Sequence, residues 1–88
     1  MKVEFLSKFD QDLDEISQPS AKKSIASIIQ RVESVSAIHQ IPHLKKLQGF
    51  KNAFRIRVGD FRIGIFVEGG TIQFARVKNR KDIYRFFP

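Results

Sequence analysis

The spacing of hydrophobic residues changes near residue 44. Before that point apolar residues recur every three or four positions, which is typical of amphipathic helices. After it they recur at every second position, which is typical of strands with one buried face. The first half of the chain therefore predicts helices and the second half predicts a sheet.

Residues 2–6, KVEFL, alternate and predict a short first strand. A helix follows, with Ser7 as its expected cap and apolar residues at helical spacing, namely Phe9, Leu13 and Ile16. Pro19 ends this helix because it disfavours helical geometry at the residue before it. Ser20 is the expected cap of a second helix that runs to about Ala37 or Ile38. Its apolar stripe comprises Ile25, Ile28, Ile29, Val32 and either Val35 or Ser36. The short break between the helices predicts an antiparallel hairpin that covers one face of the sheet.

The second half predicts a possible edge strand within residues 44–50 and three further strands over 53–58, 61–67 and 71–77. Gly59-Asp60 suits a type II′ turn and Gly69-Gly70 a type I′ turn. Residues 80–88 predict a short helix or an irregular tail, with Phe86 and Phe87 available for docking. The expected fold is α+β in one domain, residues 1–88: a strand, two helices and an antiparallel meander.

Pairing the strands through Gly59-Asp60 sets Arg57 opposite Arg62 and Arg55 opposite Gly64. The three arginines then share one face, and the other face is apolar, with Phe54, Ile56, Val58, Phe61, Ile63 and Ile65. Like charges directly across a ladder cost up to about 1 kcal/mol, so the arrangement favours an anionic ligand. Guanidinium groups match phosphate oxygens in shape and charge.

Small residues lie beside these arginines. Gly64 and Ala75 face each other in the expected register and predict an open patch on the arginine face. Strict alternation also places Arg76 on the apolar face, opposite Ile63. Two explanations stay open: a bulge near Ala75, or a strand that has already left the core.

The net charge of +7 is unevenly distributed. Residues 1–43 carry five Lys or Arg against six acids, and residues 44–88 carry eleven against three. This asymmetry favours a polyanionic partner, although a solvated basic face that aids solubility is the alternative.

Several other functions are disfavoured. The chain has no cysteine, and its two histidines, His39 and His43, fall in an expected linker, where we interpret them as solvated loop residues. We therefore expect no metal and no cofactor. No segment resembles a signal peptide or a membrane span, so we expect a cytoplasmic protein with no membrane partner. Neither a Ser-His-Asp set nor paired carboxylates are present.

The segments LKKLQGFKNAFRIRVGDFRIGIF and ARVKNRKDIYRF resemble the RelE/ParE superfamily of type II toxins, and look closest to its RelE-like messenger-RNA interferases. The matching features are Leu47 with Gly49, Arg55 with Arg57, Gly59 with Arg62, then Arg80 and Tyr84. The sequence departs at Lys78-Asn79-Arg80, where many relatives carry Gly-His-Arg. It also has arginines at 55 and 57, where some relatives carry lysines.

The resemblance implies an endoribonuclease that cuts messenger RNA, commonly on the ribosome. A ribose 2′-hydroxyl would attack the adjoining phosphate and leave a 2′,3′-cyclic phosphate, without a metal. Arg55, Arg57, Arg62 and Arg80 would hold the phosphate. Tyr84 would accept the 2′-hydroxyl proton, with its pKa lowered by nearby cations, or would stack on a base. A diffuse RNA-binding surface would comprise Lys45, Lys46, Lys51, Lys78 and Lys81.

The resemblance also implies a cognate antitoxin, with operator DNA bound only by the toxin–antitoxin complex. The C-terminal segment DIYRFFP is a candidate docking site for an amphipathic helix of that partner, or else closes the chain's own core. Two other functions stay open: a ParE-like toxin that inhibits DNA gyrase, and a catalytically inactive nucleic-acid-binding relative.

Overall fold

The computed structural model describes residues 1–88. Its element order is the predicted one, with a strand and two helices before the remaining strands. The elements are β1 (Lys2–Phe5), α1 (Ser7–Glu15), α2 (Pro19–Ser34), a 3-10 turn η1 (Ile38–Gln40), β2 (Leu44–Lys46), β3 (Ala53–Val58), β4 (Phe61–Glu68), β5 (Thr71–Asn79) and α3 (Ile83–Phe86).

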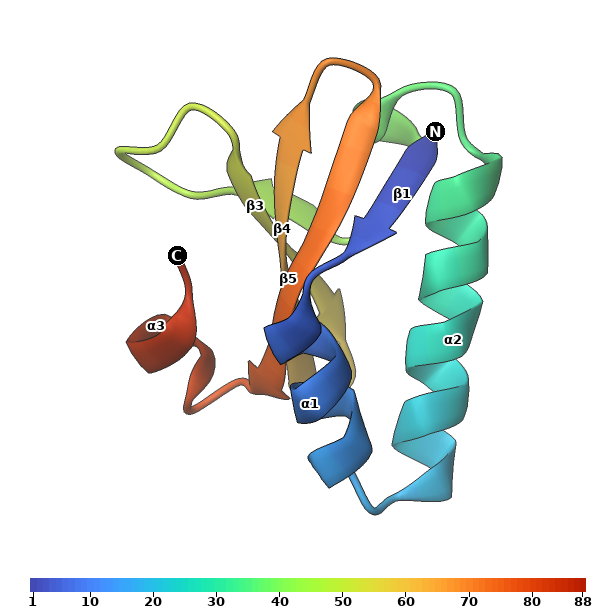
Figure 1. The fold of residues 1–88 in the computed structure, drawn as a ribbon, viewed down its shortest axis with the longest axis vertical. Helices are drawn as coiled ribbons and strands as arrows, with labels where there is room; N and C mark the ends of the chain where they lie inside the picture. The colour runs from blue at the N-terminus through green and yellow to red at the C-terminus, as the bar shows by residue number, and fades with distance from the viewer.

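The five strands form one sheet in the order β1-β5-β4-β3-β2 (Figure 1). Strands β2 to β5 make the predicted antiparallel meander, with β2 at one edge. Strand β1 forms the other edge and pairs parallel with β5, Val3 opposite Ile72. The N-terminal strand thus closes onto the last strand, a contact between the two ends of the chain that the local pattern does not specify.

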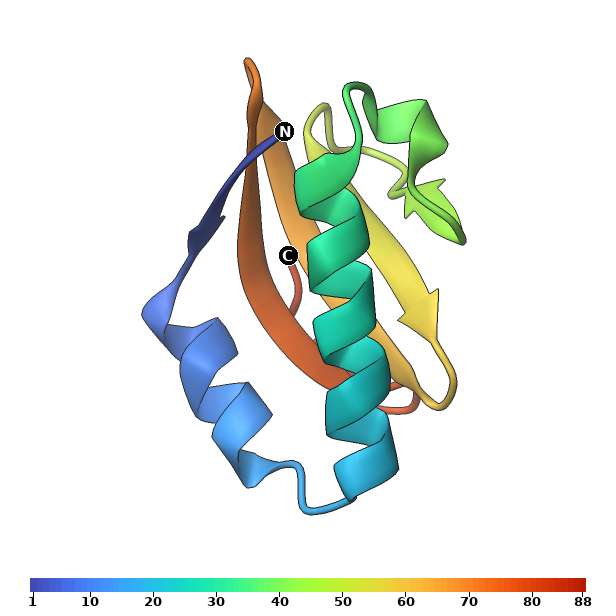
Figure 2. The same cartoon turned by 90° about the vertical axis from the view of Figure 1, so that its right-hand side faces the viewer.

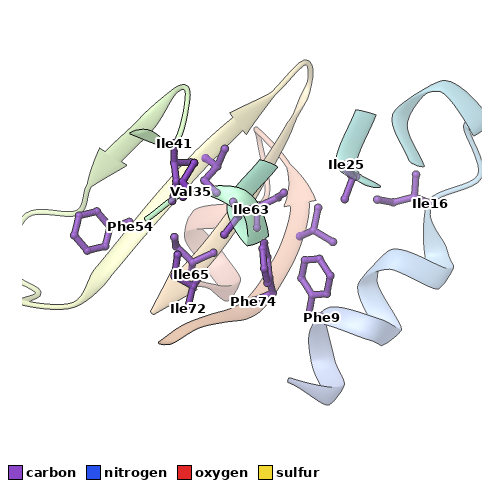
Figure 3. Packing of buried hydrophobic residues seen from close by; sticks show 13 residues of the cluster. Phe9, Ile16, Ile25, Val35, Ile41, Phe54, Ile63, Ile65, Ile72 and Phe74 are labelled. Atoms are coloured by element: carbon purple, nitrogen blue, oxygen red, sulfur yellow. The ribbon is translucent and has the colours of Figure 1, made fainter. Parts of the chain in front are cut away.

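Both long helices cover the same face of this sheet (Figure 2). Between helices and sheet lies a core of thirteen buried residues, drawn in Figure 3: Phe9, Ile16, Ile25, Val32, Val35, Ile41, Phe54, Ile56, Ile63, Ile65, Ile72, Phe74 and Val77. The predicted apolar faces of the helices and of β3 and β4 are therefore confirmed. None of the helices is long and apolar enough to cross a bilayer.

The predicted helix starts are wrong by one or two residues. Helix α1 begins at Ser7, one residue earlier than predicted, with Leu6 as its extended N-cap residue. The Leu6 N–H still donates to the Phe74 carbonyl, so strand pairing continues to the residue directly before the helix. Helix α2 begins at Pro19, because proline has the backbone angle of a first helical residue and lacks the N–H that would go unpaired there. Ser7 and Ser20 thus lie inside the first turns and cap nothing.

Helix α2 also ends earlier than predicted. Its last residue is Ser34, and Val35 has extended backbone with its side chain buried in the core. The next residues are held by the Gln40 side chain, whose oxygen accepts the backbone N–H groups of Ser36 and Ala37. This local network competes with another helical turn, and the chain can therefore turn back toward the sheet.

Both glycine turns have the II′ pattern. Gly59 and Gly69 each have φ of 59°, and neither following residue has a positive φ. The type I′ prediction at Gly69-Gly70 is therefore wrong, since that turn needs a positive φ at both positions.

The bulge near Ala75 is confirmed. The register shifts between Gly64 and Ile65, so that Gly64 pairs with Arg76 and Ile63 pairs with Val77. The shift moves Arg76 off the helix-covered face and places Val77 in the core. One extra residue in β5 thus resolves the clash between a charged side chain and the apolar face.

The predicted open patch on the arginine face is wrong, because the chain's own C-terminus fills it. Helix α3 lies on the opposite side of the sheet from α2 (Figures 1 and 2). The ring of Phe87 sits where a side chain at Gly64 would be. A second, smaller core results, made of Ala53, Ala75, Ile83 and Phe87.

Candidate nucleic-acid interface

The predicted arginine face exists. We use this name for Arg55, Arg57 and Arg62 on the side of the sheet away from α2. Strands β3 and β4 pair in the expected register, with Arg57 opposite Arg62 and Arg55 opposite Gly64. Strand β2 adds a further cation, because Lys45 pairs with Arg55. Successive side chains of a strand point to opposite faces, so Lys45, Arg55, Arg57 and Arg62 all lie on the same face of the sheet.

Arg62 is fixed against the hairpin turn. Its Nη1 donates to the carbonyl oxygens of Gly59 and Phe61, each at 2.9 Å. The pKa of Arg62 lies below its usual value, first because of burial and then because of the positive charges of Arg55, Arg57 and Arg80. Arg80 therefore lies close enough to Arg62 for its charge to act on that guanidinium. A bound anion would relieve this mutual repulsion.

Arg57 contacts a residue that the sequence did not connect to the site. Its Nη2 lies 3.1 Å from His43 Nδ1, and its backbone N–H donates to the His43 carbonyl. A guanidinium has only donors, so Nδ1 must be the acceptor and the ring proton sits on Nε2. The interpretation of His43 as merely a solvated loop residue was incomplete. Leu44 pairs with Ile56 in the β2–β3 register, so one further pair in the same register would have placed His43 opposite Arg57.

Tyr84 joins the arginine face from α3. The Arg55 Cζ lies 5.2 Å from the centre of the Tyr84 ring, in a cation–π contact. The tyrosine is 62% exposed, while Ile83 directly before it and Phe87 three residues after it are buried. The buried neighbours anchor α3 to the sheet, and Tyr84 is thereby presented to solvent beside the arginines.

Two shallow hollows adjoin each other on this face and share Lys45 and Arg55. The first has a volume of about 380 Å³ and is lined by His43, Leu44, Lys45, Arg55, Arg57 and Arg62. The second, of about 320 Å³, is lined by Lys45, Lys46, Leu47, Gln48, Arg55 and Tyr84. Basic side chains and one aromatic ring at an open surface suit a single-stranded nucleic acid, which needs phosphate contacts and a stacking platform.

The predicted RNA-binding lysines do not all gather at this surface. Lys46 lines the second hollow and donates to the Phe50 carbonyl at 2.6 Å. Lys78 lies opposite Arg62, but its ammonium is paired with Asp12 at 3.1 Å. Lys51 and Lys81 are exposed in loops and line neither hollow.

The chain is similar to proteins of one family over nearly its whole length. A family model described as the ParE toxin of the type II toxin–antitoxin system, parDE, matches residues 3–84. Toxin RelE3 of Methanocaldococcus jannaschii is 42% identical over 89 residues, with all of both chains covered. The chain belongs to the RelE/ParE superfamily of type II toxins, as the sequence resemblance indicated.

Solved structures agree with this family. The RelB-RelE antitoxin–toxin complex from Methanococcus jannaschii contains a chain with a TM-score of 0.81 and 39% identity, covering 96% of this chain and 98% of that one. The chromosomal ParDE system from P. aeruginosa matches with a TM-score of 0.60 and 18% identity, over 90% and 95% of the two chains. The second likeness shows the fold alone, whereas the first adds sequence similarity to a RelE-type toxin.

Proposed function

We propose that residues 1–88 form one toxin domain that acts in the cytoplasm as an endoribonuclease and cleaves messenger RNA on the ribosome. The observation that carries this proposal is the arginine face with Tyr84 beside it. None of Arg55, Arg57, Arg62 and Arg80 forms an ion pair within the chain. A cluster of arginines without acidic partners, with an exposed tyrosine in contact with Arg55, suits the charge that develops on a reacting phosphate.

The proposed reaction is attack of a ribose 2′-oxygen on the adjoining phosphorus. The bond from phosphorus to the 5′-oxygen then breaks, leaving a 2′,3′-cyclic phosphate and a 5′-hydroxyl. The four arginines bind the phosphate and stabilise its added negative charge. They cannot take the proton of the 2′-hydroxyl, because arginine stays protonated. Tyr84 is a proton-transfer group, and none of these steps calls on a metal.

The remaining cations bind RNA farther from the reacting phosphate. Lys45 and Lys46 adjoin the site in the two hollows. Lys51, Lys78 and Lys81 contact more distant phosphates. The contact of Lys78 is weakened by its ion pair with Asp12. Such contacts are independent of sequence and supply general affinity.

A cognate antitoxin holds the toxin inactive in this proposal. The support comes from the relative at 39% identity, which was solved as a complex of RelB with RelE. An antitoxin with acidic residues would neutralise the arginine face, and only the complex would bind operator DNA.

A second candidate function is inhibition of DNA gyrase. It is favoured by the family description, which names the ParE toxin. The constellation of Arg55, Arg57, Arg62 and Tyr84 favours RNA cleavage instead, since a gyrase inhibitor has no need of a phosphate-binding face. A catalytically inactive nucleic-acid-binding relative is the third.

The test is primer extension on cellular messenger RNA after brief induction of the wild type, Arg62→Ala, Tyr84→Phe and Arg31→Ala. We expect discrete cuts inside translated frames, reduced about 100-fold or more by the first two changes. Arg31 lies on α2, on the other side of the molecule, and its variant should cut like the wild type. Intact messages with arrested growth would favour gyrase, and intact messages with normal growth would favour an inactive relative.

A further inference from the structure

His43 is held in an unusual backbone conformation. Its φ is 59°, and it is the only non-glycine residue in the chain with a positive φ. This conformation is unfavourable for a residue with a Cβ, because the Cβ comes too close to the backbone carbonyl oxygen. Two contacts to Arg57 hold it there, one to the histidine carbonyl and one to Nδ1. The conformation turns the imidazole onto the arginine face, where it lines the first hollow.

His43 and Tyr84 lie at opposite ends of the arginine face. Tyr84 contacts Arg55 and His43 contacts Arg57. These arginines are two residues apart on β3, which separates their Cα atoms by roughly 7 Å along the strand. A phosphate bound between the two arginines would therefore lie next to the arginine that contacts Tyr84 and next to the one that contacts His43. Two proton-transfer groups at different arginines suit displacement at phosphorus, because the attacking and leaving oxygens lie roughly in line on opposite sides of the phosphorus atom.

The imidazole is the group on this face with a lone pair suited to take a proton. The charged side chains that line its hollow are all cations: Lys45, Arg55, Arg57 and Arg62. In the free protein the Nδ1 lone pair accepts from Arg57. A phosphate is a stronger partner for a guanidinium than a neutral imidazole is, because the bond is charge-assisted and can be bidentate. Substrate binding would draw Arg57 to the phosphate and free Nδ1.

We propose that His43 is the general base of this site and that Tyr84 is its general acid; the inference rests on the proposed function. His43 Nδ1 takes the proton of the 2′-hydroxyl as the bond from the 2′-oxygen to phosphorus forms. The bond from phosphorus to the 5′-oxygen breaks, and that oxygen takes the phenolic proton of Tyr84. Proton exchange with water then restores both side chains.

The test uses purified wild type, His43→Asn and His39→Asn on ribosomes programmed with one defined messenger RNA. Asparagine tolerates the left-handed backbone, and its amide oxygen can still accept from Arg57, so the fold and the Arg57 contact are kept. We expect cleavage by His43→Asn to fall about 100-fold or more with RNA binding unchanged. His39 is exposed in η1 and outside both hollows, and its variant should match the wild type.

The pH profile separates proton transfer from a structural role. The wild-type rate should rise with pH on the acid side of the profile, because a general base acts only when it is deprotonated, and the His43→Asn variant should lose this limb. Imidazole added to a His43→Gly variant should restore part of the rate. Unchanged cleavage by His43→Asn, with activity still lost in Arg62→Ala, would overturn this inference alone. A wild type that cuts no RNA would overturn it together with the proposed function.

Discussion

Gly64 allows the C-terminus to reach the sheet. A Cβ at this position would overlap the ring of Phe87, which lies directly against the Gly64 backbone. Phe87 also contacts Phe66, with ring centres 5.0 Å apart. Because Phe87 and Ile83 anchor α3, the missing side chain of one residue in β4 decides where Tyr84 stands relative to Arg55.

Gly64→Ala should therefore destabilise the protein by about 1–3 kcal/mol, or release the tail, because the new methyl group overpacks the second core. Urea unfolding measures the stability, and hydrogen exchange of the α3 amides reports release of the tail. Gly70→Ala is the control, since no atom lies within 4 Å of its Cβ and its φ is not positive. Equal stability and equal α3 protection in the two variants would show that Phe87 does not depend on the space at Gly64.

At the scale of elements, Asp12 joins α1 to the edge of the sheet. Strand β1 ends at Phe5, and beyond it the outer edge of β5 has no neighbouring strand. The Asp12 carboxylate takes that place, accepting the Val77 N–H at 3.1 Å and two bonds from the Arg76 guanidinium at 2.8 and 3.0 Å. Lys78 lies 3.1 Å away. The buried Asp12 carboxylate thus accepts a backbone N–H at the unpaired edge of β5 and pairs with two cations, Arg76 and Lys78.

The pKa of Asp12 is below its usual value. Burial acts to raise it, but the hydrogen bonds from Arg76, Val77 and Lys78 and the charge of Arg76 together outweigh burial. The folded protein therefore binds fewer protons than the unfolded chain at acid pH. The contribution of Asp12 to the free energy of unfolding is fully present above the pKa of the unfolded chain, about 3.9, and is lost as the pH falls through the lower pKa of the folded protein.

Asp12→Asn should lower stability at neutral pH by about 1–3 kcal/mol, because the amide leaves Arg76 and Lys78 without a charged acceptor. The difference from wild type should begin to shrink as the pH falls below the unfolded pKa of about 3.9, and it should disappear only below the lower pKa of the folded protein, where the wild-type carboxylate is also neutral. Urea midpoints measured from pH 2 to 7 test both statements. Asp14→Asn, at an exposed site on the same helix, should follow the wild-type curve. A pH-independent loss in Asp12→Asn would contradict the assignment.

At the scale of the whole molecule, the sheet separates two environments. The helices α1 and α2 bury one face, and the other face carries the arginines and the C-terminal helix (Figures 1 and 2). The net charge of +7 arises in the half of the chain that forms β2 to β5 and α3. Binding of RNA to one face should therefore depend on the charges of that face and not on the total charge.

This can be measured with the Tyr84→Phe protein, which we expect to cleave slowly, and a short single-stranded RNA at several salt concentrations. The logarithm of the binding constant should fall linearly with the logarithm of salt, by roughly 0.7 per phosphate contacted. Adding Arg57→Gln should reduce this slope by about that amount. Adding Lys22→Gln, on α2, should leave the slope unchanged. Equal slope changes in the two double variants would indicate a diffuse charge effect without a defined interface.

Much of the fold and of the arginine face could be predicted because both depend on neighbouring residues. A two-residue turn fixes the register of β3 and β4, and a period of two then assigns Arg55, Arg57 and Arg62 to one face. The bulge at Ala75 was foreseen as one of two alternatives because a buried Arg76 would be costly. Helix ends were less predictable, since packing and strand pairing outweighed the serine caps.

The sequence by itself thus determined the order of elements, the hairpin register, the side of the sheet that carries the cations and the resemblance to RelE-type toxins. Only the tertiary structure decided that β1 pairs with β5, that Phe87 covers Gly64, that Asp12 closes the edge of β5 and that His43 meets Arg57. Hydrophobic period and turn chemistry act over a few residues, so a sequence displays them directly. The other contacts join segments that only the closed sheet brings together, and their energies depend on distances and burial that no local pattern contains.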